Sequence, residues 1–358
     1  MIPYILMIAF PILATALFGR KSEDFDNDRR QKIIVWIFFG CLFILLALRH
    51  EDVGVDMERY LNHFKSISDD TLGEILKDKT QEQGFWILNK FISIFSTSER
   101  FYLVVMAACT LIPVAILYSK NSENAMLTIA IFIVMSNFAI MFTAIRQAIA
   151  VGIVALSYKY VKEKKFWKFL IFIVIAFFFH QSALIALLLY PFYHMNITKM
   201  KLLFFVPVLG FVLAFNKPIF EFLLQFLGEY GENYEAEETG AFMMILLIAV
   251  FVFAAYVIPT DENMDEETKG LRGISVLALL LQTFSLVSTV AMRMNYYFIL
   301  FIPLLMPRIF NRCAEKNIRA YKTLSLLLAV FLIAYFIYKG ITGGDILEMY
   351  PYKFLWEE

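Results

Sequence analysis

The feature that most constrains this chain is a succession of apolar runs, each about as long as a membrane crossing. A bilayer core of about 30 Å needs about 20 mostly apolar helical residues. Ten runs of that order, separated by polar clusters, cover residues 3–19, 33–48, 101–118, 125–142, 144–160, 202–215, 241–258, 272–291, 294–310 and 321–338. With 60% hydrophobic and 18% charged residues, the composition excludes a soluble globular domain. The sequence therefore predicts an all-α polytopic integral membrane protein.

An eleventh apolar region, 167–193, is longer than one crossing needs and carries His180 and Gln181 at its middle. If it crossed once, the basic stretch 308–322 would face outside, against the positive-inside rule. We therefore expect two arms, 167–179 and 181–193, forming a re-entrant hairpin with its tip near His180. Irregular backbone at such a tip must be buried in protein or line a wet cavity. One membrane domain, 1–358, would then hold about 11–12 transmembrane or re-entrant helices.

Charge along the chain sets the expected orientation. The N-terminus has no basic leader region and no small-residue cleavage site, so we do not expect a removable signal peptide. Basic residues follow the first run, which places the N-terminus outside. On this topology the inside loops hold 20 basic and 12 acidic residues, a charge of +8, and the outside carries −8. The formal net charge of zero gives no reason to expect a nucleic-acid partner.

Two outside loops are too long to be simple connections. The loop 49–100 contains an amphipathic stretch, 59–77, and a second helical pattern, 84–96; the loop 216–240 contains an apolar-faced helix and an acidic, aromatic turn. Long loops with their own secondary structure are usually lids or binding elements. The alternative, which the sequence leaves open, is that these amphipathic helices rest on the membrane surface.

Several cationic or polar residues fall at the expected outer membrane level: Arg49, His50, Arg146, Gln147, His180 and Arg293. An arginine at the centre of a membrane helix costs about 2.5–3.5 kcal/mol, so such residues usually face a bundle interior and mark function. The alternative is that they snorkel to lipid headgroups. Converging guanidinium groups suit a phosphate or pyrophosphate, because their planar forks match its oxygens.

The sequence also offers candidates for a general base and lacks the marks of cofactor chemistry. Asp56, Glu82 or His180 could accept the proton of a reacting hydroxyl, and the sequence does not rank them; a solvated loop carboxylate is the alternative for the two acids. The acids around Asp56 do not have calcium-loop spacing. No P-loop, dinucleotide fingerprint, zinc-protease or serine-hydrolase motif occurs. We expect neither a metal nor a cofactor.

At this point the sequence resembles the EpsG family, within the wider group of Wzy-type bacterial polysaccharide polymerases. The resembling segments cover nearly the whole chain, and their order and spacing carry the resemblance more than any single one. They are Leu48-Arg49 with Val53-Gly54-Val55-Asp56 and Tyr60, Glu82-x-Gly84-Phe85 with Leu88-Asn89, Arg146-Gln147-Ala148-Ile149-Ala150, Phe179-His180-Gln181-Ser182-Ala183-Leu184, Arg293 with Tyr296-Tyr297-Phe298, and Tyr350-Pro351-Tyr352.

The resemblance implies a glycosyltransferase of GT-C-like architecture in the bacterial cytoplasmic membrane, with its active site facing outside or the periplasm. It implies polymerisation of undecaprenyl-pyrophosphate-linked oligosaccharide repeats, without a metal, beside membrane lipids and with a flippase and a chain-length regulator as possible partner proteins. Arg49, Arg146 and Arg293, with Arg59 and Gln147, would hold the pyrophosphate. Tyr297 and Tyr352 would contact the substrate, although belts of interfacial aromatic residues are common in membrane proteins.

Two rival functions remain open at this point. A transporter of lipid-linked oligosaccharide would use the same cations without chemistry, but the sequence shows no paired halves with matching broken helices. An O-antigen-ligase-like transferase would use the same donor and a different acceptor. Products made from a lipid-linked repeat separate the three functions.

Overall fold

The computed structural model describes residues 24–78, 82–135, 137–224, 241–257, 264–314 and 352–357, with scattered positions between 319 and 338. Over these residues every regular element is a helix, and the one β-type pairing among them is an isolated antiparallel bridge between Arg49 and Phe354. The predicted run 3–19, much of the run 321–338 and residues 225–240 of the second loop lie outside the described residues. The chain divides into two compact units, Met1–Leu184 with Leu324–Glu358, and Ile185–Thr323.

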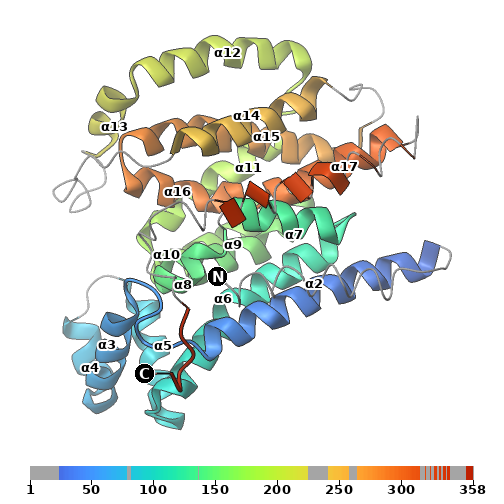
Figure 1. The fold of residues 1–358 in the computed structure, drawn as a ribbon. Coiled ribbons are helices and arrows are strands. Elements are labelled where there is room, and N and C mark those ends of the chain that lie inside the picture. Colours follow the sequence, from blue (N-terminus) through green and yellow to red (C-terminus); the bar gives the residue numbers. More distant parts are fainter. Residues whose placement is uncertain are drawn as a thin grey trace. The chain divides into compact units, whose positions relative to one another are not determined.

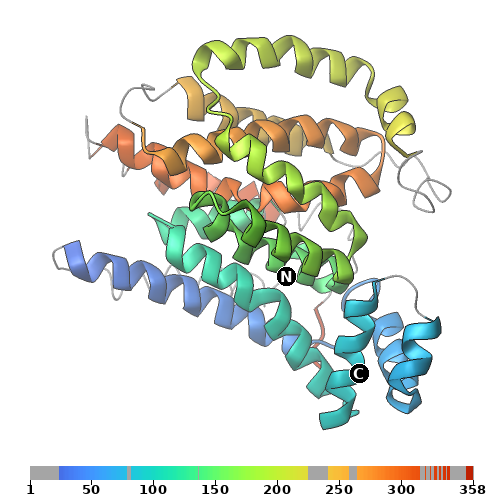
Figure 2. The same cartoon turned by 180° about the vertical axis from the view of Figure 1, so that it is seen from behind.

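The first unit is a row of long helices with a group of short ones at one end of the row (Figures 1 and 2). Helix α9 packs between α10 and α6, and α6 packs against α2; α3 packs against α5. The elements are α2 (Asp24–Ala47), α3 (Met57–Asp69), α4 (Leu72–Asp78), α5 (Gln83–Phe95), α6 (Glu99–Asn121), α7 (Ala125–Val134), α8 (Ala139–Thr143), α9 (Ile145–Lys162) and α10 (Phe166–Phe179).

Local sequence explains where these helices stop and start. The amphipathic stretch 59–77 is two helices, because Asp70 is extended (φ −73°, ψ 148°) and ends α3. Helix α4 then begins with a capping box: the Glu74 carboxylate accepts hydrogen bonds from the Thr71 backbone N–H and hydroxyl, both at 2.7 Å. The predicted run 125–142 likewise divides into α7 and α8, whereas α5 matches the predicted pattern 84–96.

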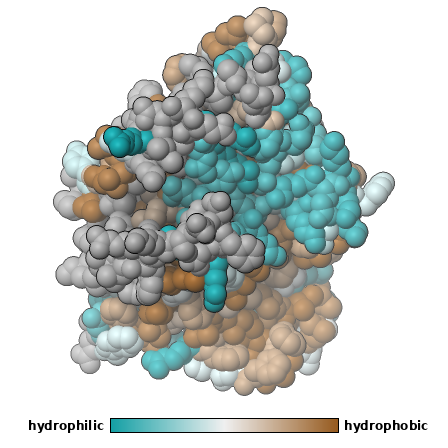
Figure 3. All heavy atoms as spheres, turned by 90° about the vertical axis from the view of Figure 1, so that its right-hand side faces the viewer, coloured by the Kyte–Doolittle hydropathy of each residue, from teal (hydrophilic) through white to brown (hydrophobic). Residues whose placement is uncertain are grey.

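Two described helices are long and apolar enough to cross a membrane, Asp28–Ala47 and Glu99–Asn121. The number rises to four if each of two bent helix pairs is one span: Lys199–Ala214 with Asn216–Phe222, bent by 79°, and Val290–Ile299 with Ile302–Arg312, bent by 42°. Several other predicted crossings are shorter apolar helices, so the predicted total of 11–12 stays a prediction. Large apolar side chains face outward, including Trp167 at 75% exposure, and Figure 3 shows hydrophobic areas as well as a large hydrophilic area on one face.

Polar contacts tie together the loops that the charge analysis places inside. In the first unit, the backbone N–H of Ala125 donates to the Gln31 side-chain oxygen at 2.6 Å. Lys162 donates to the Asn121 side-chain oxygen at 2.5 Å. The segments around residues 31, 121–125 and 162 therefore meet at one end of the helix row, as loops on one side of a membrane must.

The second unit is built around α15, which packs against α11, α14, α16 and α17. Its predicted run 272–291 is interrupted, because α15 ends at Gln282, a short 3₁₀ helix follows, and the hydroxyl of Ser288 caps α16 by accepting from Val290 N–H at 3.1 Å. The elements are η1 (Gln181–Leu188), which starts in the first unit, α11 (Leu189–His194), α12 (Lys199–Ala214), α13 (Asn216–Leu224), α14 (Ala241–Val257), α15 (Glu266–Gln282), η4 (Thr283–Leu286), α16 (Thr289–Ile299) and α17 (Ile302–Ala314).

A charged network joins the start of α15 to the end of α17. Asp265 caps α15 by accepting from Thr268 N–H at 2.8 Å, and it also accepts from Arg312 at 2.5 Å. Arg308 lies 3.1 Å from the Glu267 carboxylate. Acids of one predicted inside loop thus pair with bases of another, which agrees with both loops lying on the same side of the membrane.

Candidate active site

A buried carboxylate, Glu82, is the centre of the polar cluster in the first unit. Glu82 directly precedes α5 and has a left-handed backbone (φ 53°, ψ 38°), which residues other than glycine rarely adopt. The residue is 6% exposed. Strained backbone of this kind persists only where surrounding contacts hold it, and it is frequent at functional sites.

Two residues distant in sequence hold the Glu82 carboxylate. One oxygen lies 2.5 Å from His180 Nδ1, and the other forms a short ion pair with the Arg146 guanidinium. Burial alone would raise the pKa of Glu82. The hydrogen bond from His180, electrostatic attraction to His180 and Arg146, and a hydrogen bond from the Gln181 backbone outweigh it, so the pKa lies below its ordinary value. Glu82 is therefore a carboxylate at neutral pH.

The ends of three helices bring these residues together. Helix α10 ends at Phe179, and His180 is extended (φ −158°, ψ 122°), which turns the chain before η1. Arg146 lies in the first turn of α9, which packs against α10. Gly84 lets α5 approach closely: a Cβ there would lie 3.0 Å from the Phe178 carbonyl oxygen. The expected hairpin around His180 stays a prediction, because most of its second arm belongs to the other unit.

Aromatic rings surround the Arg146 guanidinium. Its carbon lies 6.0 Å from the centroid of the Tyr60 ring and 5.9 Å from that of Phe85. The Tyr60 hydroxyl is hydrogen-bonded to Arg146, and burial raises the pKa of Tyr60, with the Arg146 charge opposing that rise. The Arg146 side chain is 31% exposed. A cation so placed can bind an anionic group without leaving its aromatic walls.

Arg49 is almost completely buried and clamps the loop after α2 to the end of α8. Its guanidinium donates to the Phe142 carbonyl oxygen at 2.5 Å and to that of Val53 at 3.4 Å. Gly54 has φ +106° and packs on the same Phe142 carbonyl, where any Cβ would clash. These contacts give Arg49 a structural role, because they hold the loop after α2 against α8. Its expected role in binding pyrophosphate stays a prediction.

Tyr102, in the first turn of α6, is a residue that the sequence analysis missed. Its ring stacks on Phe64 with the ring centroids 4.5 Å apart, and its hydroxyl is fully buried with no hydrogen-bond partner among the described residues. A tyrosine near the start of a predicted membrane helix reads as an interfacial aromatic, and the sequence holds no further signal.

The other candidates of the first unit have contacts of their own. Asp56 pairs with Arg59 at 2.8 Å, at the start of α3. Gln147 is buried beside Arg146 in α9. The hydroxyl of Tyr352, which is 8% exposed, donates to the Leu45 carbonyl oxygen at 2.8 Å. The structure thus places Asp56, Arg59, Gln147 and Tyr352 within the same unit as Glu82.

The remaining candidates, Arg293 and Tyr297, belong to the second unit. Both lie in α16, and Tyr297 is fully buried. In the same helix, Asn295 donates to the Ala278 carbonyl at 2.8 Å and to Gln282 at 2.7 Å, which ties α16 to α15. A shared site for Arg293 and Arg146 stays a prediction.

The cluster offers a fixed carboxylate, an imidazole and a guanidinium in contact. When His180 Nδ1–H donates to Glu82, Nε2 of the neutral ring is the nitrogen that can accept a proton. Arg146 supplies positive charge beside it. Among the described residues, no three His, Cys, Asp or Glu side chains come close enough together to hold a metal ion.

Comparison with known proteins gives one assignment. No curated protein and no solved structure matches the chain. The model of the EpsG family matches residues 32–354, which is nearly the whole chain and includes every candidate named above. Together with its apolar helices, this match identifies a multi-pass membrane protein. The chain therefore belongs to the EpsG family, a family of Wzy-like polysaccharide polymerases.

Proposed function

We propose that this protein lengthens an extracellular polysaccharide by joining undecaprenyl-pyrophosphate-linked oligosaccharide repeats at the outer leaflet of the bacterial cytoplasmic membrane. In this reaction an acceptor hydroxyl attacks the anomeric carbon of the donor chain. The bond from that carbon to the pyrophosphate breaks, and the lipid pyrophosphate leaves. The family assignment supports a polysaccharide polymerase, and the contact between Glu82, Arg146 and His180 carries the assignment of residues.

Among the three candidate bases, the geometry favours His180. Glu82 is held by two partners that lower its pKa, so it is a weak proton acceptor. Asp56 is paired with Arg59. His180 contacts Glu82 through Nδ1, which leaves proton transfer to Nε2 and fixes the ring, as a carboxylate does for the histidine of a hydrolase triad. His180 would take the proton of the acceptor hydroxyl, and Glu82 would position it.

Arg146 would bind the pyrophosphate and stabilise the charge that develops on it as the glycosyl bond breaks. Stabilisation of developing charge by a pre-positioned cation is often the largest single contribution to catalysis. The rings of Tyr60 and Phe85 hold this guanidinium in place before the substrate arrives. Arg49, Arg293, Arg59 and Gln147 would extend the anion-binding surface, and Tyr297 and Tyr352 would contact the saccharide.

The finer parts of the proposal concern surroundings and architecture. The bundle would be GT-C-like, the site would face the outside or the periplasm, and the transfer would be independent of metal. The charge partition supports this orientation, because the loops carrying basic residues near 31, 121 and 162 meet at one end of the first unit. A flippase would deliver the repeats, and a chain-length regulator would act on the product.

Reconstitution of the purified protein with a lipid-linked repeat tests the proposal. We expect a ladder of longer lipid-linked products. Arg146→Ala and Arg146→Lys should both shorten or abolish the ladder, because neither side chain offers the planar fork. Arg100→Ala is the matched control, since Arg100 is an exposed arginine of the same unit.

The same assay separates the alternatives. One-step transfer to a different acceptor would make the protein a ligase, and movement of the repeat across the membrane without a new bond would make it a transporter. A normal ladder from both Arg146 variants at equal protein levels would overturn the role of Arg146.

A further inference from the structure

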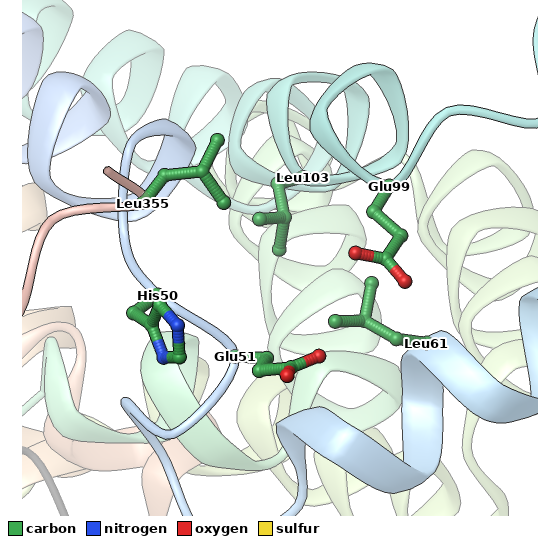
Figure 4. Close-up of a pocket in the computed structure, with 6 residues that line it drawn as sticks. All are labelled: His50, Glu51, Leu61, Glu99, Leu103 and Leu355. Atoms are coloured by element: carbon green, nitrogen blue, oxygen red, sulfur yellow. The ribbon is translucent and has the colours of Figure 1, made fainter. Parts of the chain in front are cut away.

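A hollow with polar and apolar walls lies in the first unit, which also holds the Glu82 cluster. Its volume is ≈ 210 Å³, the space of about seven water molecules at about 30 Å³ each. Figure 4 shows its six lining side chains surrounding one space, with the Glu51 and Glu99 carboxylates on different sides of it. The lining residues are His50, Glu51, Leu61, Glu99, Leu103 and Leu355.

One wall of the hollow is a C-terminal strap, residues 352–357, which crosses the loop after α2. The Leu355 N–H donates to the Leu48 carbonyl at 2.9 Å, and the His50 N–H donates to the Lys353 carbonyl at 3.0 Å. Arg49 and Phe354 form an antiparallel bridge between these bonds. The strap therefore fixes Leu355 over the hollow through backbone contacts, and we call this hollow the strap pocket.

The strap pocket adjoins the residues around Arg49 and Arg146 along the chain. His50 lines the pocket and directly follows Arg49. Leu61 also lines it and directly follows Tyr60, whose ring centroid lies 6.0 Å from the Arg146 guanidinium carbon. Consecutive residues of a helix point about 100° apart, so Tyr60 and Leu61 occupy neighbouring faces of α3.

The side chains that line the strap pocket indicate which class of ligand it can bind. Glu51 and Glu99 disfavour an anionic ligand such as the pyrophosphate or an acidic sugar. Glu99 forms a short ion pair with Lys65, so a hydrogen-bond donor and hydrogen-bond acceptors meet at the edge of the strap pocket. Sugar hydroxyls both donate and accept hydrogen bonds, while the C–H face of a sugar ring packs on apolar side chains. Leu61, Leu103 and Leu355 supply that apolar wall.

We propose that the strap pocket binds one neutral sugar residue of the saccharide substrate, next to the site of glycosyl transfer. This inference rests on the proposed function for the identity of the substrate. The pocket then sets which sugar of a repeat reaches the reacting centre, and it discriminates against uronic acids at that position. No bond is made or broken in the pocket.

Saturation-transfer NMR with the full chain, in a detergent without a sugar headgroup, tests the pocket directly. The probes are a neutral hexose disaccharide and a uronic-acid-containing disaccharide of the same size. We expect saturation of the neutral probe alone. Glu51→Gln removes a carboxylate from an exposed position, and Leu355→Trp fills the pocket; each should reduce the signal at least about fivefold. Glu58→Gln, an exposed acid on α3 outside the pocket, should leave it unchanged.

The outcomes separate this inference from the proposed function. Equal saturation of both probes, none of the neutral probe, or a signal unchanged by both Glu51→Gln and Leu355→Trp overturns the pocket. Neutral-sugar binding that disappears in Leu355→Trp while the product ladder stays normal removes the pocket from the reaction. A normal ladder from the Arg146 variants overturns the proposed site while leaving selective sugar binding in place.

Discussion

Replacing Glu82 gives the sharpest test of the cluster, because this one carboxylate serves two partners. In Glu82→Gln the amide oxygen can still accept from His180 or from Arg146, while the amide NH₂ must face the other donor. One of two charge-assisted contacts is lost. In Glu82→Ala both are lost, and two groups that can carry positive charge are left side by side. The two variants therefore predict a graded series.

The burial of Glu82 and Arg146 decides how much unfolding free energy the Glu82 variants lose. Hydrogen bonds to charged groups contribute about 1.5–3 kcal/mol each. The Glu82 side chain is 3% exposed, but that of Arg146 is 31% exposed and recovers part of its hydration. We therefore take the lower end: a loss of about 1.5 kcal/mol of unfolding free energy for Glu82→Gln and about 3 kcal/mol for Glu82→Ala. Turnover should fall more, by about 10²-fold or greater in both, since His180 loses its orientation.

The pH dependence of the Glu82 contribution has a definite sign. Its pKa in the folded protein lies below the ordinary value of 4.5. A carboxylate with a lowered pKa contributes stability that is fully present above 4.5 and is lost as the pH falls through the folded value. The stability difference between wild type and Glu82→Gln should therefore shrink as the solution is made more acidic than pH 4.5.

Unfolding by SDS in mixed micelles measures these stabilities, and product ladders from a lipid-linked repeat measure turnover. Glu58→Gln is the control for removing one acid from the same outer segment. If Glu82→Gln matched wild type in both measurements at equal expression, the carboxylate would hold neither partner in solution and the cluster would be refuted as a functional unit.

Three further predictions concern packing around the site and in the second unit. Gly54→Ala should lower the free energy of unfolding by about 2 kcal/mol or more, because a Cβ would clash with the Phe142 carbonyl at a positive φ. Thermal unfolding checks this, with Gly40→Ala as the control, because a Cβ at Gly40 meets nothing within 4 Å. Tyr352→Phe should lower the free energy of unfolding by about 1 kcal/mol, because the hydrogen bond from the hydroxyl to the Leu45 carbonyl is lost. Unfolding in SDS that matched wild type would contradict this. Asn295→Ala should lower the free energy of unfolding by about 1–3 kcal/mol, because the Gln282 side-chain oxygen loses the Asn295 amide as its donor. Loss of folded protein on heating measures this, and an unchanged value would mean that the link between α15 and α16 does not stabilise the protein.

The candidate site shows which inferences depended on sequence and which needed coordinates. Arg146 and His180 stand out in sequence because a charged or titratable residue in an apolar run is costly and so is unusual. Their contact with Glu82 spans 64 and 98 positions, and no local pattern encodes it. Tyr102 was missed for the same reason, because its buried hydroxyl matters only through residues brought near it by folding.

The sequence by itself determined the helical class, the membrane character and the expected orientation, because each follows from counts over short stretches: apolar length against bilayer thickness, and basic residues against loop position. It also indicated the family through segments in order. Only the tertiary structure decided that Glu82 holds Arg146 and His180, that Arg49 donates to backbone carbonyls, and that a C-terminal strap forms one wall of a pocket in the same unit. These contacts depend on how helices pack at their ends, where the identity of a partner is fixed by three-dimensional proximity and not by spacing along the chain.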